Sequence, residues 1–146
     1  MILIMGEGFL GKYLKQKFSK NLSYDVEIFS MREDNPSLEF LLDISKKAEF
    51  IIDCLDPNYF LEDKSFLQKR EKIRKSLKTS NLKKYIYISS SNIYKPSTKE
   101  INEESETLNT IQNTYVMQKL QTEKFFLNKF DNKSILITRL PNLWSS

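Results

Sequence analysis

The sequence of 146 residues contains no histidine, one cysteine, three glycines and four prolines. Without histidine the chain lacks the commonest metal ligand and the usual general base, so acid–base chemistry would rely on Tyr, Lys, Asp or Glu. The single cysteine, Cys54, cannot form an intramolecular disulfide, which fits a reducing cytoplasm. No apolar run approaches the ~20 residues of a membrane span. No basic segment precedes the first apolar run, so we expect no signal peptide.

What is present fits one domain over residues 1–146, because 40% of the residues are apolar and can form a single core. Basic residues outnumber acidic ones by 23 to 19, and we interpret this as a mostly solvated surface that mildly favours a phosphate-bearing ligand. We expect neither nucleic acid nor a membrane as a partner. A nucleic-acid-binding domain is a weaker alternative, because the basic residues form no stripe with interleaved aromatics.

All three glycines fall in one motif, Gly6-x-Gly8-x-x-Gly11, which follows an apolar run at residues 2–5 and opens an amphipathic helical pattern. This strand–turn–helix context is typical of a dinucleotide-binding loop. Gly6 would permit the tight turn, Gly8 the approach of a pyrophosphate, and Gly11 close packing of helix on strand. The free N–H groups at the helix start would bind the phosphates. We expect cofactor contacts at Gly6, Gly8, Phe9, Leu10 and Gly11.

Apolar patterns along the chain alternate between strands and helices. Strands are predicted at residues 2–5, 24–29, 50–54, 85–89 and 134–139, and helices from residue 9 to a break at 21–23, at 38–44, at 59–79 and at 109–129. This alternation predicts an α/β fold, a Rossmann-type doubly wound parallel sheet of about five strands with helices on both faces. Right-handed crossovers predict the strand order 2-1-3-4-5, with the cofactor across the carboxyl ends of strands 1 and 3.

Two further stretches carry groups suited to chemistry. The fourth predicted strand ends in the run Ser89-Ser90-Ser91-Asn92-Ile93-Tyr94, where open α/β sheets place their ligands. The last predicted helix carries Tyr115 and Lys119, which share one face because they lie four residues apart. The alternatives are a simple strand-to-loop transition for the serines and an ordinary surface pair for Tyr115 and Lys119.

Together these elements resemble the extended short-chain dehydrogenase/reductase family, in particular its NAD-dependent epimerase/dehydratase branch, which modifies nucleotide sugars. The resemblance rests on the glycine loop, the serine run with Tyr94, the Tyr115/Lys119 pair and the segment Arg139–Trp144. It implies that Tyr115 is the catalytic acid/base, and that Lys119 holds the nicotinamide ribose and lowers the pKa of the tyrosine. The catalytic serine would be Ser90, four residues before Tyr94, with Ser91 as the alternative.

The chemistry of the side chains agrees with these roles. A free tyrosine has a pKa of about 10, so only about a thousandth is ionised at neutral pH. A nearby ammonium and an oxidised nicotinamide both favour the phenolate, which could then take a proton from a sugar hydroxyl. A serine hydroxyl could stabilise the charge that develops on the same oxygen.

The resemblance also implies a nucleotide-sugar substrate and an NAD or NADP cofactor. A homodimer is one of the oligomeric states open to the chain. We lean toward NADP, because Arg32 follows the second predicted strand and an arginine can bind a 2′-phosphate. Glu33 and Asp34 argue the other way, since either could reach a free ribose hydroxyl.

The remaining candidates have simpler interpretations. Asp53 and Asp56 could suggest a metal site, but we interpret them as a helix cap and a solvated side chain, with Asp56 and Pro57 starting the next helix. We expect no metal. Cys54 is interpreted as a small buried residue and Trp144 as a packing residue.

The chain departs from the family in three places. The extra strand that carries the family's adenine-side Asp has no counterpart, and Lys95 replaces a common glycine. A complete member also continues into a C-terminal part that binds the sugar nucleotide. We therefore expect a fragment, a reduced paralogue or a protein that borrows its substrate surface from a partner, and we expect the isolated chain to bind the cofactor with weak or absent turnover until that substrate part is supplied. The main alternative to an enzyme is a non-catalytic or truncated dinucleotide-binding module.

Overall fold

The computed structural model describes residues 1–21, 23–31, 38–56, 64–90, 93–94, 102, 107 and 114–141, with side chains described for all of these except 64–66 and 114–115. The strands are β1 (Ile2–Met5), β2 (Val26–Phe29), β3 (Phe50–Asp53), β4 (Lys84–Ser90) and β5 (Ile135–Leu140). The helices are α1 (Phe9–Asn21), α2 (Leu38–Lys47), α3 (Lys64–Ser76) and α4 (Thr114–Lys129).

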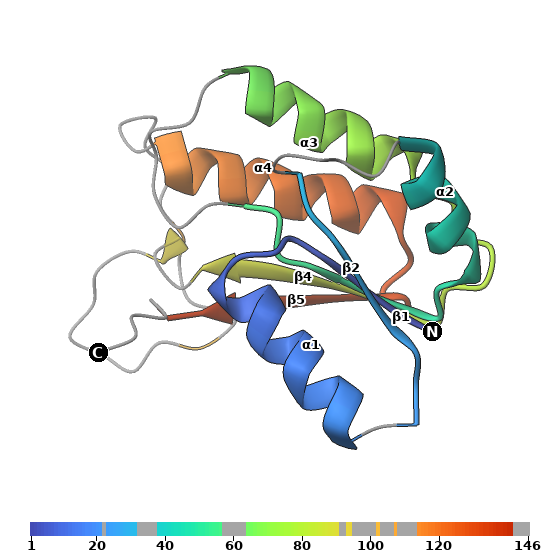
Figure 1. Cartoon of the computed structure of the whole chain (residues 1–146). Helices are drawn as coiled ribbons and strands as arrows, with labels where there is room; N and C mark the ends of the chain where they lie inside the picture. The colour runs from blue at the N-terminus through green and yellow to red at the C-terminus, as the bar shows by residue number, and fades with distance from the viewer. Residues whose placement is uncertain are drawn as a thin grey trace.

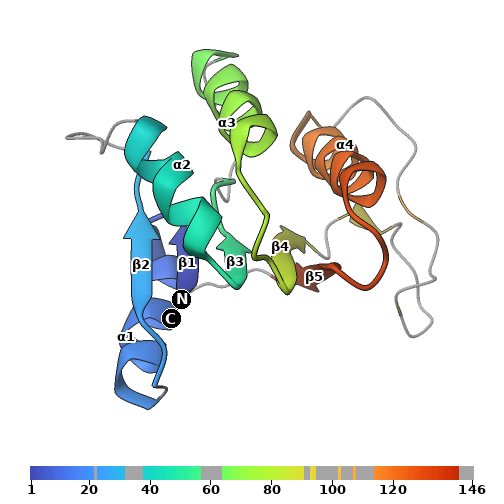
Figure 2. The ribbon, with the colours of Figure 1, turned by 90° about the vertical axis from the view of Figure 1, so that its right-hand side faces the viewer.

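The five strands form one parallel sheet in the order β2-β1-β3-β4-β5, which confirms the predicted fold class and strand order. The strand order reverses at β1, because β1 pairs with β2 on one side and with β3 on the other. Right-handed crossovers then place α1 on one face of the sheet and α2, α3 and α4 on the other (Figures 1 and 2).

Each face of the sheet has its own core, because alternate residues of a strand point to opposite faces. Strand β1 is buried on both faces, which explains its uninterrupted apolar sequence. The core under α2, α3 and α4 includes Leu3, Met5, Ile51, Tyr85, Tyr87 and Phe126. The core under α1 is formed by Ile2, Ile4 and Ile52, against which Leu14 and Phe18 pack.

The element bounds differ from the predicted ones mainly at the ends. Helix α3 is described from Lys64 to Ser76, and its expected apolar residues Ile73 and Leu77 are buried, whereas the side chain of Phe66 lies outside the description. Strand β2 starts at Val26 rather than at residue 24. None of the helices described here is long and apolar enough to cross a membrane.

Candidate functional site

The glycine loop joins β1 to α1, and its three glycines have different surroundings. Gly6 has a φ of 109°, and a Cβ there would lie 2.4 Å from the Cys54 carbonyl oxygen. A Cβ on Gly11 would lie 1.9 Å from the Gly6 carbonyl oxygen. A Cβ on Gly8 would meet no atom of the described residues within 4 Å. The fold therefore requires glycine at Gly6 and Gly11, whereas Gly8 borders open space.

The loop lies at the point where the strand order reverses. The Gly6 N–H donates to the Phe29 carbonyl at 2.8 Å, and the Cys54 N–H donates to the Met5 carbonyl at 2.7 Å. These bonds hold the loop between the carboxyl ends of β2 and β3, which is where ligands bind in open α/β sheets.

The start of α1 faces the same crevice. The Lys12 N–H donates to the Gly8 carbonyl at 3.0 Å, so Gly8 is the N-cap residue. The N–H groups of the first helical turn have no acceptor within the helix, and they carry the positive end of its dipole. The side chain of Phe9 is 61% exposed, whereas that of Leu10 is half-buried.

The second part of the predicted site lies at the carboxyl end of β4. Ser90 is the last residue of β4 and is buried. The Lys119 Nζ lies 3.1 Å from the Ile88 carbonyl oxygen, so this ammonium also sits at the end of β4. Tyr115 belongs to the first turn of α4, one turn before Lys119, but its side chain lies outside the description.

Several other predicted positions lie outside the described residues. These are Arg32, Glu33, Asp34, Ser91 and Trp144. The structure therefore neither supports nor opposes their proposed roles.

The structure contradicts the expectation of a solvated side chain among the two aspartates after β3, whereas the residues that Asp56 is predicted to cap lie outside the described part of the chain. Asp53 is fully buried, and its carboxylate accepts two hydrogen bonds from Arg74, at 2.8 and 2.9 Å. It also accepts bonds from the Tyr85 hydroxyl at 2.6 Å and from the Leu55 N–H at 3.1 Å. Asp53 therefore closes the turn after β3 and anchors α3 at the same time.

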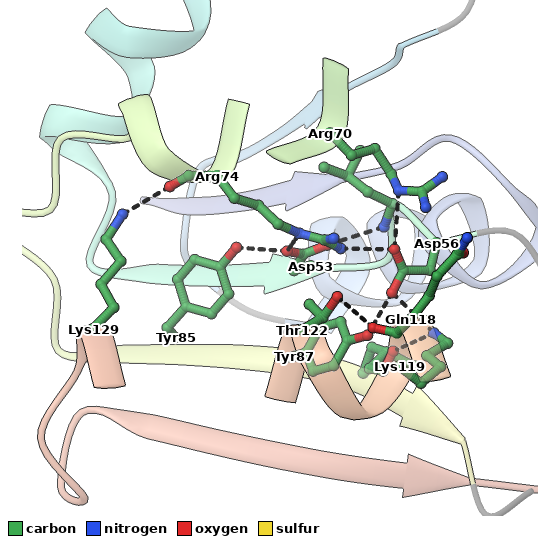
Figure 3. A network of polar contacts seen from close by, with 12 residues as sticks. Asp53, Asp56, Arg70, Arg74, Tyr85, Tyr87, Gln118, Lys119, Thr122 and Lys129 are labelled. Atoms are coloured by element: carbon green, nitrogen blue, oxygen red, sulfur yellow. Dashed lines mark hydrogen bonds and ion pairs between the residues drawn. The ribbon is translucent and has the colours of Figure 1, made fainter. Parts of the chain in front are cut away.

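Asp56 joins three cations at the carboxyl edge of the sheet (Figure 3). Its Oδ1 lies 3.0 Å from Arg74 Nη2 and 3.1 Å from Arg70 Nε. Its Oδ2 lies 3.1 Å from Lys119 Nζ and accepts a hydrogen bond from the Tyr87 hydroxyl. Burial opposes ionisation of Asp56, but the three cations outweigh it and hold the pKa of the carboxyl well below its usual range.

The two tyrosines on β4 are donors in this network. Burial, together with the carboxylates of Asp53 and Asp56, raises the pKa of Tyr85 and Tyr87 well above the usual value. Both phenols therefore stay protonated at neutral pH and donate to the two carboxylates. Burial also raises the pKa of the half-buried Cys54 thiol, to about 12.

A second buried group lies one helical turn beyond Lys119. Glu123 accepts hydrogen bonds from the Ser89 hydroxyl at 2.6 Å and from Arg139 Nε and Nη2 at 3.1 and 2.8 Å. Arg139 Nη1 in turn donates to the Tyr94 hydroxyl at 2.8 Å. This group ties the serine run and the residues after it to α4 and β5.

Sequence reasoning missed both groups, although the residue spacing carried a signal. In α3 the arginines at positions 70 and 74 share a stripe with the buried Ile73 and Leu77, and in α4 Glu123 continues the four-residue spacing of Tyr115 and Lys119. The two aspartates pair with cationic side chains of the protein. The described residues include no cluster of three or more His, Cys, Asp or Glu side chains that could hold a metal ion.

The comparisons identify the fold. No protein-family model matches the chain, and no curated protein matches it. It resembles UDP-glucuronic acid 4-epimerase from Bacillus cereus in complex with NAD, at 20% identity and a TM-score of 0.75, covering 97% of this chain and 57% of the other. It also resembles a short-chain dehydrogenase/reductase superfamily protein from Agrobacterium tumefaciens with bound NAD, at 15% identity and a TM-score of 0.72, covering 95% and 48%.

A third similar structure is RMD from Pseudomonas aeruginosa complexed with NADPH, at 19% identity and a TM-score of 0.66, covering 97% of this chain and 54% of the other. The chain thus has the Rossmann-type fold of short-chain dehydrogenase/reductase structures. It spans about half the length of the structures that it matches.

Proposed function

We propose that the chain binds a nicotinamide dinucleotide and provides the hydride-transfer site of an epimerase, dehydratase or reductase that acts on a nucleotide sugar. The observation that carries this proposal is the contrast within the glycine loop. Gly6 and Gly11 are closed in by backbone, whereas Gly8 borders open space at the point where the strand order reverses. A loop of this shape fits a pyrophosphate, because the ligand needs close approach to backbone at Gly8.

The cofactor would contact the edge of the sheet in two places. Gly8 and the first-turn N–H groups of Phe9, Leu10 and Gly11 would hold the pyrophosphate. Lys119, at the carboxyl end of β4, would hold the nicotinamide ribose. The solved structures with this fold include proteins bound to NAD and one bound to NADPH, which supports the choice of cofactor.

A bound nicotinamide would supply the hydride acceptor and donor, and the chain's own side chains would move the proton. Tyr115 would exchange a proton with a sugar hydroxyl, and the ammonium of Lys119, one helical turn away, would favour its phenolate form. The Ser90 hydroxyl would donate a hydrogen bond to the reacting oxygen and stabilise its developing charge.

Gly8→Val tests the cofactor site. We expect the dissociation constants for NADH and NADPH, measured by calorimetry, to rise at least about tenfold, which corresponds to about 1.4 kcal/mol. The fold should persist, because a Cβ at Gly8 meets no atom within 4 Å in the part of the chain that the structure describes. Gln16→Val, on the exposed side of α1, is the matched control and should bind like the wild type. Wild-type affinity in Gly8→Val would place the site elsewhere.

The choice between the two cofactors has its own test. We expect NADPH to bind more tightly than NADH, because Arg32 can pair with a 2′-phosphate while no acidic residue ends β2. Arg32→Met should remove the difference without weakening NADH binding. A clear preference of the wild type for NADH would contradict this expectation.

The alternative is a dinucleotide-binding module without catalysis. The observation in its favour is that the Lys119 ammonium already pairs with Asp56 and the Ile88 carbonyl. Both functions require dinucleotide binding, so the distinguishing measurement is hydride transfer to NAD or NADP in the presence of nucleotide sugars.

A further inference from the structure

The site contains an acidic residue for which the resemblance assigns no role. Asp56 follows β3, and its side chain is 8% exposed. One carboxylate oxygen pairs with two arginines of α3, and the other pairs with Lys119 of α4. Figure 3 shows the carboxylate between the two helices, at the edge of the sheet where β3 and β4 end.

These contacts restrict a side chain that is normally mobile. Lysine has a flexible four-carbon stem and loses much rotamer freedom when it is ordered. In this structure the Lys119 ammonium lies 3.1 Å from Asp56 Oδ2, 3.1 Å from the Ile88 carbonyl oxygen, and 5.3 Å from the centre of the Tyr87 ring. The side chain is 6% exposed. Its entropy is therefore lost on folding, and a ligand would not have to order it.

We propose that Asp56 is a positioning residue for Lys119, fixing its ammonium where the nicotinamide ribose would lie. This inference rests on the proposed function, because it assumes that Lys119 binds the ribose. Asp56 fixes the ammonium of Lys119 without neutralising its positive charge, because the same carboxylate also pairs with Arg70 and Arg74. The same contacts couple the cofactor site to α3, which itself contributes no residue to the predicted site.

Asp53 provides a matched control. It is fully buried, and like Asp56 it pairs with Arg74 and accepts a bond from a β4 tyrosine, in this case Tyr85. Its described partners are Arg74, Tyr85 and the Leu55 N–H, whereas Asp56 pairs with Lys119. Replacing either aspartate therefore disturbs the same network, but only the change at Asp56 releases the Lys119 ammonium directly.

The experiment compares two probes in three proteins. NADH carries the nicotinamide ribose, whereas ADP carries only the adenosine and diphosphate part. We measure dissociation constants for both by calorimetry, and unfolding midpoints, in the wild type, Asp56→Asn and Asp53→Asn. We expect Asp56→Asn to weaken NADH binding about tenfold and ADP binding less than about twofold, as for the loss of a hydrogen bond to a charged group. Asp53→Asn should lower the midpoint but leave the ratio of the two constants unchanged.

Two outcomes separate this inference from the proposed function. If the wild type binds neither NADH nor ADP, the proposed function fails and this inference fails with it. If the wild type binds NADH and Asp56→Asn keeps the wild-type ratio of NADH to ADP affinity, only the positioning role of Asp56 is overturned.

A second variant covers the case in which Asp56→Asn does not fold. Asp56→Glu keeps the negative charge for Arg70 and Arg74 but displaces the carboxylate by one methylene. We expect it to fold and to weaken NADH binding selectively. An unchanged ratio in Asp56→Glu would then overturn the inference.

Discussion

At the scale of single residues, the glycines of the loop show how one residue type serves two purposes. Gly6 and Gly11 are required by the fold, because a side chain at either position would collide with backbone. Gly8 has no such requirement, because a side chain there meets open space. Packing against the described residues therefore does not explain the glycine at this position, whereas the proposed close approach of a pyrophosphate would.

Alanine substitutions separate these two roles. We expect Gly11→Ala to lower the free energy of unfolding by about 2–3 kcal/mol, because its Cβ would lie 1.9 Å from the Gly6 carbonyl oxygen and the backbone must shift. Gly8→Ala should change it by less than about 0.5 kcal/mol. Urea titrations of the two variants and the wild type provide the measurement. Equal stability of Gly11→Ala and the wild type would show that the helix does not pack on the loop in this way.

At the scale of elements, the buried faces of α3 and α4 carry charge as well as apolar residues. In α3, Arg74 lies between the buried Ile73 and the solvent-facing Lys75, and its guanidinium binds Asp53 with two hydrogen bonds. Removing one partner of a buried pair leaves the other without compensation, which costs more than the pair itself contributes.

A double-mutant cycle measures this coupling. We expect Arg74→Met and Asp53→Asn each to lower the free energy of unfolding by about 3–5 kcal/mol, as is usual for breaking a buried ion pair. The double variant should lose less than the sum of the two, by at least about 1 kcal/mol. Lys75→Met, an exposed neighbour on α3, should change stability by less than about 0.5 kcal/mol. Additive losses would show that Arg74 and Asp53 act independently.

The same elements show how far the sequence determines the outcome. The strand order could be predicted, because continuous apolar runs such as residues 2–5 identify buried parallel strands and handedness then limits the connections. The ion pairs could not, because charged residues in a helix usually face solvent and a single sequence does not show their partners. The burial of Arg70 and Arg74 is explained by their ion pairs with Asp56 and Asp53, which only the folded sheet brings next to α3.

At the scale of the whole molecule, the topology brings distant segments to one edge of the sheet. Cys54, directly after β3, donates its N–H to the Met5 carbonyl at the end of β1, next to the glycine loop. Asp56, two residues after Cys54, is bonded to α4 through Lys119. Lys119 is bonded in turn to β4 through the Ile88 carbonyl. The predicted pyrophosphate loop and the predicted ribose lysine are thus connected through two contacts, Cys54 with Met5 and Asp56 with Lys119, although more than a hundred residues separate them in the sequence.

This arrangement allows cofactor binding and proton transfer to be separated by one substitution. Tyr115→Phe removes only a hydroxyl, and Tyr115 lies on the first turn of α4, one turn before Lys119. We expect it to leave the dissociation constant for NADH within about twofold of the wild type, and to lower hydride transfer with a nucleotide sugar at least about a hundredfold, as is usual for loss of a general acid or base. Calorimetry and absorbance of the reduced nicotinamide give the two readouts.

Tyr24→Phe, at a partly exposed tyrosine beside Phe50, is the matched control and should retain both properties. Wild-type turnover in Tyr115→Phe would exclude Tyr115 as the proton-transfer group, because the variant lacks the hydroxyl that would carry the proton.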